Sequence, residues 1–173
     1  MLQPQPRPHG SRVTVDPRTI EVDDGDTVVI RWPGGPPETV RILGIDTPET
    51  RHPEHDIPYG QELGEEAAAF ARGALAAAPR IELLRSATLD RFGRTLGYLF
   101  LGDRSYSVLV VSARLAEETV THFGDNGLPR EAAEVLAAAR AAGPPRFESP
   151  YVFRARMRDL SAWMKEHGAY PPH

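Results

Sequence analysis

Apolar and β-branched residues in the first part of the chain follow patterns typical of β-strands. Valine and isoleucine alternate with polar residues at 11–22, around one proline, and β-branched residues dominate 27–32. A nearly continuous apolar run, interrupted by one arginine, follows at 39–45. These patterns predict three strands, connected by turns at 24–26 and 34–37, where glycine and proline gather.

The periodicity changes to helical spacing at residues 59–78, among strong helix formers, and Pro79 ends the segment. Two more strand patterns follow at 80–85 and 95–101, with a hairpin expected at 102–103. Five strands with one helix after the third have the order of a small Greek-key barrel of the oligonucleotide-binding (OB) type. The predicted fold class is therefore α+β and rich in β-structure, with a five-stranded OB barrel at its centre.

About three helices are expected to pack on this barrel, the first of them being the segment at 59–78. A short one covers 108–116, and a longer one covers 129–142, where proline occupies the first position and glycine follows the end.

The tail predicts an extra C-terminal helix within 149–168. Its apolar side chains recur at helical spacing, namely Phe153, Met157, Leu160 and Met164. Such a stripe needs a partner surface, and single stripes serve packing within the domain more often than an oligomer interface. We therefore expect the extension to pack on the same domain.

The chain has 173 residues, of which 40% are hydrophobic and 25% charged, which suits one domain with a single core. We expect a flexible leader at 1–11, the barrel domain at 12–145 and the helical extension at 146–173. The leader is polar and rich in proline, so it has no signal-peptide core and no membrane span. No membrane partner is expected, and the sequence leaves open a secreted or a cytoplasmic location.

The sequence contains no cysteine, which excludes disulfides, thiolate metal sites and cysteine nucleophiles. The net charge of −4 argues against coating of duplex DNA, which relies on a broad basic surface. A locally basic rim can still attract a polyanion, and its candidates are Arg72, Arg80, Arg85, Arg91 and Arg94.

Three segments bring together the charges that hydrolysis of a phosphodiester requires. VRILGIDTPE at 40–49 places an arginine and two carboxylates around the end of an apolar strand. DGDT at 24–27 adds carboxylates on a glycine turn, and DRFGR at 90–94 adds a second arginine beside a turn glycine. Each segment alone is common in surface turns. Together, in this order, they predict one site for a metal ion and a phosphate.

DGDT at 24–27, VRILGIDTPET at 40–50, PYG at 58–60 and DRFGRTLGY at 90–98 resemble the staphylococcal nuclease (thermonuclease) family, over about 21–123. The resemblance implies the same OB barrel and a calcium-dependent, sugar-nonspecific endonuclease. Such an enzyme hydrolyses DNA and RNA by metal-assisted attack of water and leaves 3′-phosphate ends. One Ca²⁺ is expected, with Mg²⁺ or Mn²⁺ as substitutes. Single-stranded or flexible substrates and a monomer are also expected.

By this resemblance Asp26, Asp46 and the carbonyl group of Thr47 hold the ion, in agreement with the preference of calcium and magnesium for hard oxygen ligands. Asp24 is expected to support these ligands without contacting the ion itself. Glu49 matches the general base proposed for the family, and it either abstracts a proton from the attacking water or orders that water.

Arg41 and Arg94 are assigned to the phosphate, because a planar guanidinium group can bind two of the oxygens on which charge grows in the transition state. Phe92 stands where relatives often carry tyrosine, and it would stack on a base without offering a hydroxyl. Arg91 either holds a terminal phosphate, as a lysine does at the matching family position, or is an exposed arginine of the turn.

Two segments depart from the staphylococcal enzyme and bear on substrate affinity. Residues 119–123 do not reproduce two tyrosines that it carries near the nucleotide, and the loop at 51–56 is more acidic than its lysine-rich loop. His52 and His55 in this loop are interpreted as solvated side chains in preference to metal ligands.

The alternative function is a barrel without turnover, which binds single-stranded nucleic acid or a protein partner. A degraded module has no reason to retain the whole set of charged residues. The enzyme is therefore favoured by the joint presence of Asp26, Arg41, Asp46, Glu49 and Arg94.

Overall fold

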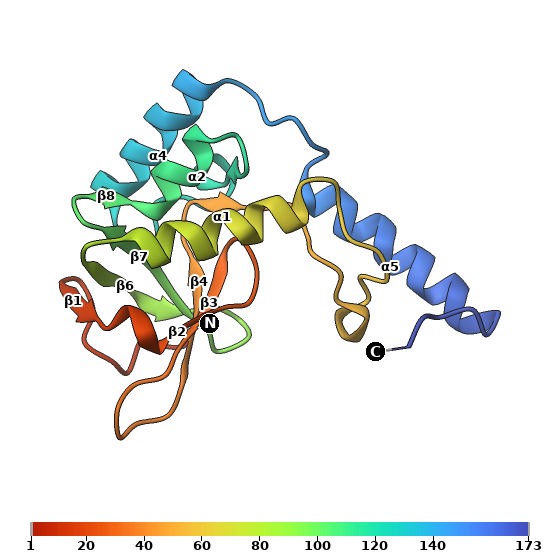
Figure 1. The fold of residues 1–173 in the computed structure, drawn as a ribbon, viewed down its shortest axis with the longest axis horizontal. Coiled ribbons are helices and arrows are strands. Elements are labelled where there is room, and N and C mark those ends of the chain that lie inside the picture. Colours follow the sequence, from red (N-terminus) through yellow and green to blue (C-terminus); the bar gives the residue numbers. More distant parts are fainter. Residues whose placement is uncertain (1, 173) are drawn as a thin grey trace.

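The main body of the protein is built on a curled sheet, and its computed structural model describes residues 2–172 (Figure 1). Its strands are β1 (Arg12–Val15), β2 (Ile20–Val22), β3 (Thr27–Ile30), β4 (Glu38–Ile42), β6 (Ile81–Leu89), β7 (Thr95–Leu101) and β8 (Arg104–Ser105). The order is β1-β6-β7-β4-β3-β2, with β8 paired to β7. Strands β4 and β7 run parallel, whereas their neighbours in the sheet pair antiparallel.

The two edges of this sheet come from one short stretch of chain. The predicted strand at 11–22 is in fact two strands, separated by the 3₁₀ turn Pro17–Thr19. Pro17 has no N–H to donate to a β-ladder, and Asp16 caps the turn through the backbone N–H of Arg18. Because β1 pairs with β6 and β2 pairs with β3 at opposite edges, the sheet must curl back on itself. The expected α+β fold with an OB-type barrel is confirmed.

The predicted strand at 39–45 also ends early, at Ile42. Gly44 has a φ of +80° and reverses the chain, which is a conformation that glycine adopts without strain. The chain then forms β5 (Ile45–Asp46), which pairs antiparallel with β9 (Glu117–Glu118) outside the main sheet.

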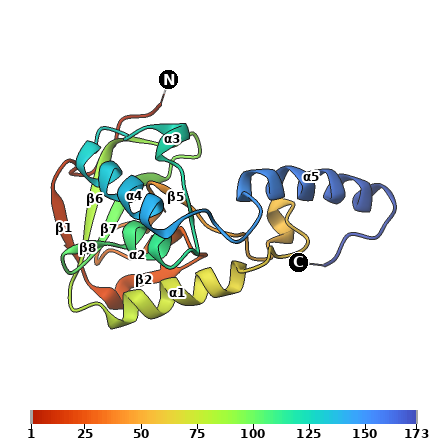
Figure 2. The ribbon, with the colours of Figure 1, turned by 90° about the horizontal axis from the view of Figure 1, so that it is seen from above.

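The helices are α1 (Gly64–Ala77), α2 (Tyr106–Ser112), α3 (Val120–Phe123), α4 (Pro129–Ala142) and α5 (Pro150–Glu166), with a 3₁₀ turn at Pro53–His55. Helix α1 begins five residues later than the pattern at 59–78 predicts, because 58–63 forms a loop. Helix α2 begins at Tyr106, with the side chain of Ser105 as its N-cap. Figure 2 shows α2 and α4 side by side on the barrel.

One main core fills the barrel and extends under α1, α2 and α4. Its largest fully buried side chains include Tyr98, Phe100 and Tyr106, and Ala71, Val110 and Val135 bring the three helices onto it. The burial of each large apolar side chain contributes about 1.5–3 kcal/mol, so this core is the main stabilising element of the domain.

Helix α5 belongs to a second, smaller cluster. Phe153 and Met157 pack on Ile57 of the loop at 51–58, with Leu160 beside them. Figures 1 and 2 show α5 next to this loop and apart from the barrel. The extension therefore packs on a loop that emerges from the barrel and not on the barrel core. Within residues 2–172, no helix combines the length and the hydropathy needed to cross a membrane.

The segment expected to be a flexible leader contacts the barrel in the structure. Pro4 forms a bridge with Thr88, and Gln5 is buried. The side-chain amide of Gln5 donates a hydrogen bond to the hydroxyl of Thr95. Met1 and His173 lie outside the described residues.

A buried ion pair connects β4 to β6 across β7. Nε and Nη2 of Arg85 donate to Oε1 and Oε2 of Glu38 at 2.7 and 2.8 Å, and both side chains are less than 5% exposed. Thr95 and Trp32 donate to the same carboxylate. Burial acts to raise the pKa of Glu38, but these hydrogen bonds, chiefly those from Arg85, outweigh it and hold the pKa below its ordinary value.

We predict that Glu38→Gln destabilises the protein by about 3–5 kcal/mol, because it leaves the guanidinium of Arg85 buried without its counter-charge. The free energy of unfolding in urea measures the effect. A carboxyl group with a lowered pKa stabilises the fold above its unfolded pKa of about 4.3, and this contribution disappears as pH falls through the folded pKa. The difference between the variant and wild type should therefore shrink in acid.

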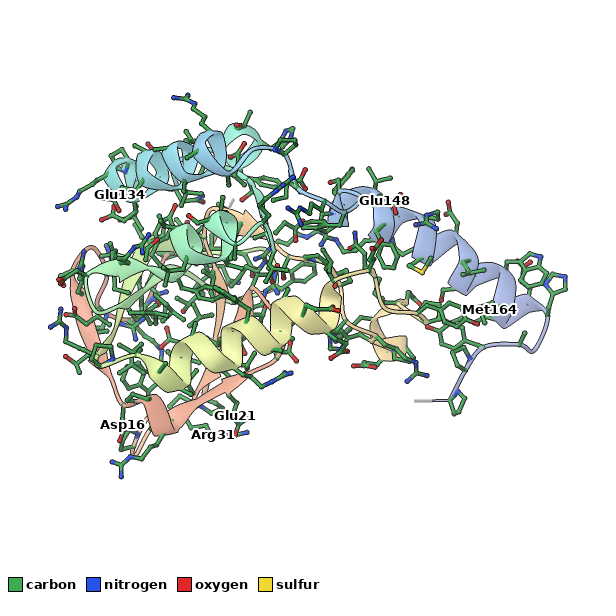
Figure 3. All side chains as sticks on the ribbon, turned by 45° about the horizontal axis from the view of Figure 1, so that its top comes forward. Asp16, Glu21, Arg31, Glu134, Glu148 and Met164 are labelled. Carbon is green, nitrogen blue, oxygen red and sulfur yellow. The ribbon has the colours of Figure 1, made fainter. Side chains whose placement is uncertain are left out.

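The matched control is Glu21→Gln, which removes the partner of Arg31 from an exposed pair between β2 and the residue after β3 (Figure 3). Little change in stability is expected there, since exposed pairs are screened by solvent. Equal stability of the two variants at neutral pH would contradict the assigned role of Glu38.

Candidate active site

The first acids of the site lie on the turn between β2 and β3. The backbone N–H of Asp26 donates to Oδ1 of Asp24 at 2.9 Å, which fixes the turn. The hydroxyl of Tyr106 donates to the carbonyl of Gly25 at 2.7 Å and so fastens the turn to α2. A Cβ atom on Gly25 would lie 2.7 Å from Oγ1 of Thr47, so glycine is required for this close approach. The turn places Asp26 in the barrel wall, 6% exposed.

Arg41 on β4 lies between the two aspartates that were predicted as metal ligands. Its Nη1 is 3.0 Å from Oδ1 of Asp26, and its Nη2 is 3.1 Å from Oδ1 of Asp46. Asp46 reaches this position because the chain reverses at Gly44, between β4 and β5. The hydroxyl of Ser107 on α2 donates to the carbonyl of Leu43 and holds that reversal in place.

Thr47 completes the predicted ligand group. Its backbone N–H and its hydroxyl both donate to Oδ2 of Asp26, at 2.9 and 3.0 Å. All three residues are buried: Asp26 is 6% exposed, Asp46 5% and Thr47 2%. The structure thus brings together the three residues assigned to the metal.

The start of α1 positions Glu49. Its backbone N–H donates to the side-chain oxygen of Gln61, and its carbonyl accepts from the backbone N–H of Gln61 at 2.8 Å. A Cβ on Gly64 would lie 2.3 Å from that carbonyl, so the first residue of α1 must be glycine for the loop to pack there. The carboxylate of Glu49 belongs to the same cluster as Asp46, because one arginine contacts both side chains.

Arg154 of α5, which the sequence pattern did not single out, contacts two of these acids. Its Nη2 lies 2.7 Å from Oδ2 of Asp46, and its Nη1 lies 3.0 Å from Oδ1 of Asp46 and 2.5 Å from Oε1 of Glu49. The available signal was its place next to Phe153, at the margin of the apolar stripe of α5. A pattern of this kind does not reveal which acids the arginine meets.

Burial and charge act in opposite directions on these carboxyl groups. Burial, and then the charge of Asp26, raise the pKa of Asp24 well above its ordinary value. Burial acts to raise the pKa of Asp26 as well, but Arg41 and the hydrogen bonds outweigh it and the pKa is lowered. The pKa values of Asp46 and Glu49 are raised by burial, against the opposing effect of Arg154. A glutamate with a raised pKa is better suited to accept a proton near neutral pH.

The charged side chains of the turn at 90–94 have partners within the turn itself. Nε of Arg94 donates to Oδ2 of Asp90 at 2.7 Å, and Phe92 is 68% exposed. The guanidinium carbons of Arg91 and Arg94 lie 4.6 and 5.5 Å from the centre of the Phe92 ring. Within residues 2–172, no hydrogen bond or ion pair joins these side chains to the acids around Arg41.

The histidines of the loop are engaged locally. Nδ1 of His52 lies 3.2 Å from Oε1 of Glu54, and Nε2 lies 2.6 Å from the hydroxyl of Thr50. The part of the chain that the structure describes contains no group of three His, Cys, Asp or Glu arranged to hold a metal ion.

The donors around Arg41 suit a hard cation on chemical grounds. Asp26 and Asp46 offer carboxylates and Thr47 offers a carbonyl, which are the oxygen ligands that calcium and magnesium select. Asp26 directly precedes β3, Asp46 ends β5 and Thr47 follows it. The backbone of these segments is held by hydrogen bonds to α2 and to Asp26. The residues present therefore fit such an ion.

The curled sheet, its covering helices and the acid–arginine cluster define an OB-type domain with a buried charged site. Residues 39–143, more than half of the chain, match the family described as "Staphylococcal nuclease homologue", and the chain belongs to this family. The family assignment made from the motifs is confirmed. Helix α5 and the turn that carries Asp26 lie outside the matched residues.

Individual relatives agree with this assignment. The chain is 38% identical to the thermonuclease of Staphylococcus intermedius over 96 residues, which are 55% of this chain and 54% of the relative. It is 34% identical to the thermonuclease of Staphylococcus hyicus over 101 residues, 57% and 56% of the two chains. It is 30% identical to the SPbeta prophage-derived endonuclease YokF of Bacillus subtilis (strain 168) over 94 residues, 54% and 30% of the two. The chain thus spans about half the length of the thermonucleases that it matches.

We predict that Gly25→Ala destabilises the protein by about 1–3 kcal/mol, because the new methyl group must push Thr47 away from Asp26. Thermal unfolding measures the loss. The control is Gly35→Ala, where the nearest atom to a new Cβ is Cβ of Trp32 at 3.8 Å, an ordinary contact. If the two alanine variants melt together, the close approach of the two turns is not a constraint on the site.

Proposed function

We propose that the protein is a metal-dependent endonuclease that hydrolyses phosphodiester bonds of DNA and RNA. The observation that carries this proposal is the guanidinium of Arg41 held between Asp26 and Asp46, with Glu49 in the same cluster. The names of the relatives, thermonuclease and endonuclease, support the same activity. The proposed metal is one Ca²⁺, with Mg²⁺ or Mn²⁺ as substitutes, and the proposed state is a monomer.

Each residue has a proposed role in the reaction. Calcium, held by Asp26, Asp46 and the Thr47 carbonyl, would polarise the scissile phosphate and neutralise part of its charge. Arg41 binds the non-bridging oxygens as their charge grows. Glu49 accepts a proton from the attacking water, and cleavage of the bond to the 5′-oxygen leaves a 3′-phosphate end.

The turn at 90–94 is the proposed contact to the rest of the substrate. Phe92 is exposed and offers a ring face on which a base can stack with little sequence preference, which favours single-stranded or flexible substrates. Arg91 lies beside that ring, which supports its proposed role as a contact to a neighbouring phosphate. Arg94 pairs with Asp90 in a partly exposed contact, and a substrate phosphate can compete for its guanidinium.

A second function has one specific observation in its favour. The guanidinium of Arg154 covers Asp46 and Glu49, the residues that the reaction needs. If that contact were permanent, the barrel would bind single-stranded nucleic acid or a protein partner without turnover. Cleavage assays separate the two functions.

We predict that the wild type cuts single-stranded DNA and RNA with calcium and that chelator abolishes cutting. Glu49→Gln should lower the initial rate by about a hundredfold to ten-thousandfold, the range for loss of a general base. The control is Glu66→Gln on the exposed face of α1, which should cut like wild type. Treatment with phosphatase and end-labelling identifies the 3′-phosphate. A wild type that binds single strands but cuts none with calcium, magnesium or manganese is a binding module.

We predict that alanine substitutions of Arg94 and Arg91, three residues apart on one turn, affect different kinetic constants. Arg94→Ala should lower kcat by about a hundredfold to a thousandfold, the usual effect of removing one preorganised donor to the transition state. Arg91→Ala should raise KM and leave kcat near the wild-type value, because its contact lies away from the scissile phosphate. Steady-state cleavage of a labelled oligonucleotide measures both. An unchanged kcat in Arg94→Ala would contradict its proposed role and leave Arg41 as the arginine that stabilises the transition state.

A further inference from the structure

Arg154 covers every carboxylate oxygen of Asp46. Its two terminal nitrogens donate to Oδ1 and Oδ2 of Asp46 at 3.0 and 2.7 Å, and Oδ1 also accepts from Arg41 at 3.1 Å. The same guanidinium contacts Oε1 of Glu49. Two-pronged arginine–carboxylate pairs of this kind are among the stronger polar contacts in proteins.

A divalent cation cannot bind Asp46 while this contact lasts. Three N–H donors already occupy most of the lone-pair sites of the carboxylate, two at Oδ1 and one at Oδ2. The cation would also stand beside the positive charge of Arg154 in a buried site, where repulsion is strong. Arg41 also contacts Asp46, but only through Oδ1, so Oδ2 depends on Arg154 alone. Binding of a cation through Asp46 therefore requires Arg154 to leave.

Helix α5 is attached in a way that permits this departure. Its apolar side chains form a small cluster with Ile57, separate from the barrel core. Ser161 and Lys165 of α5 contact Asp56, the N-cap Ser149 donates to Glu117, and Tyr170, beyond the helix, donates to the carbonyl of Pro53. Figure 3 shows Glu148 at the near end of α5 and Met164 toward its far end, so most of the helix extends away from the barrel. Displacement of α5 leaves the core of the barrel closed.

We propose that α5 is an autoinhibitory latch, in which Arg154 closes Asp46 and Glu49 against the divalent cation and is displaced when the cation binds. This inference rests on the proposed function, since it concerns the same acids. It assigns a regulatory role to a helix that lies outside the residues matched to the family.

The latch is tested by calcium binding to the full chain without nucleic acid, measured by isothermal titration calorimetry. Arg154→Ala should bind calcium about tenfold more tightly than wild type, a modest value for two coupled binding events. The matched control is Arg158→Ala, which removes the same charge from an exposed position on the same helix and should bind like wild type. Unchanged calcium affinity in Arg154→Ala overturns the latch, because Arg154 would then not oppose the cation. Weaker binding also overturns it, because Arg154 would then order the acids for the cation.

A second variant covers the case in which Arg154→Ala does not fold. Met157→Ala weakens the docking of α5 on Ile57 without altering a charge, and it should also tighten calcium binding. Calcium should in addition make the segment at 143–149 more sensitive to protease in the wild type. No gain in affinity in this variant, or no change in proteolysis, overturns the proposal.

The same samples distinguish this proposal from the nuclease. A wild type that cuts nothing, with an Arg154 variant that binds calcium more tightly, refutes the nuclease and retains the latch. A wild type that cuts, with an Arg154 variant that binds no more tightly, refutes the latch and retains the nuclease.

Discussion

The guanidinium of Arg41, 19% exposed and held between Asp26 and Asp46, is the interaction on which the arrangement of the site depends. A cation at such a place is tolerated only where acids surround it, and acids this close to one another are tolerated only where a cation separates them. Asp26 lies on the turn before β3 and Asp46 ends β5, so the ion pairs define how these two segments meet. This requirement connects the chemistry of the site to the curl of the sheet.

The curl is produced by the connection between β1 and β2. Pro17 interrupts what would otherwise be one strand, and the two halves pair at opposite edges of the sheet. The turn that follows β2 is thereby brought over the end of β4. Helix α2 then fastens this geometry, since Tyr106 and Ser107 donate to the carbonyls of Gly25 and Leu43. Consecutive residues of one helix thus hold the turn that carries Asp26 and the chain reversal that leads to Asp46.

The parts of the site that could be predicted from sequence are those encoded within short segments. The proposed ligands Asp46 and Thr47 follow an apolar strand directly, and Asp26 lies in a turn whose glycine is visible in the sequence. The position of Arg154 could not be predicted, because its partners are 108 and 105 residues away and the stripe around it indicates only a helix. The split of the first strand was visible as a proline, but its effect on pairing depends on the whole sheet.

The turn at 90–94 illustrates a different limit. The pattern DRFGR contains an aspartate four residues before its second arginine, and in the structure this local pair forms in place of a contact to the acids around Arg41. An arginine loses little conformational entropy when it pairs with a residue on the same turn, whereas a substrate phosphate is present only in the complex. Sequence similarity can therefore identify Arg94 without stating where its side chain lies in the free protein.

The charges of the cluster explain how the proposed cation site and the proposed latch can share the same acids. Asp24, Asp26, Asp46 and Glu49 lie near two arginines, Arg41 and Arg154. Burial, and then the negative charge of Asp26, raise the pKa of Asp24 well above its ordinary value. Removal of Arg154 without replacement would leave Asp46 and Glu49 short of positive charge, and such a deficit favours capture of a cation. A divalent ion brings two charges where Arg154 brings one, and it does so without the entropy loss of docking a helix. The concentration of the ion and the packing of the small apolar cluster of Ile57, Phe153 and Met157 then determine whether the ion or Arg154 occupies Asp46. Substitutions in this cluster can therefore change the strength of the latch without altering a residue that is proposed to act in catalysis.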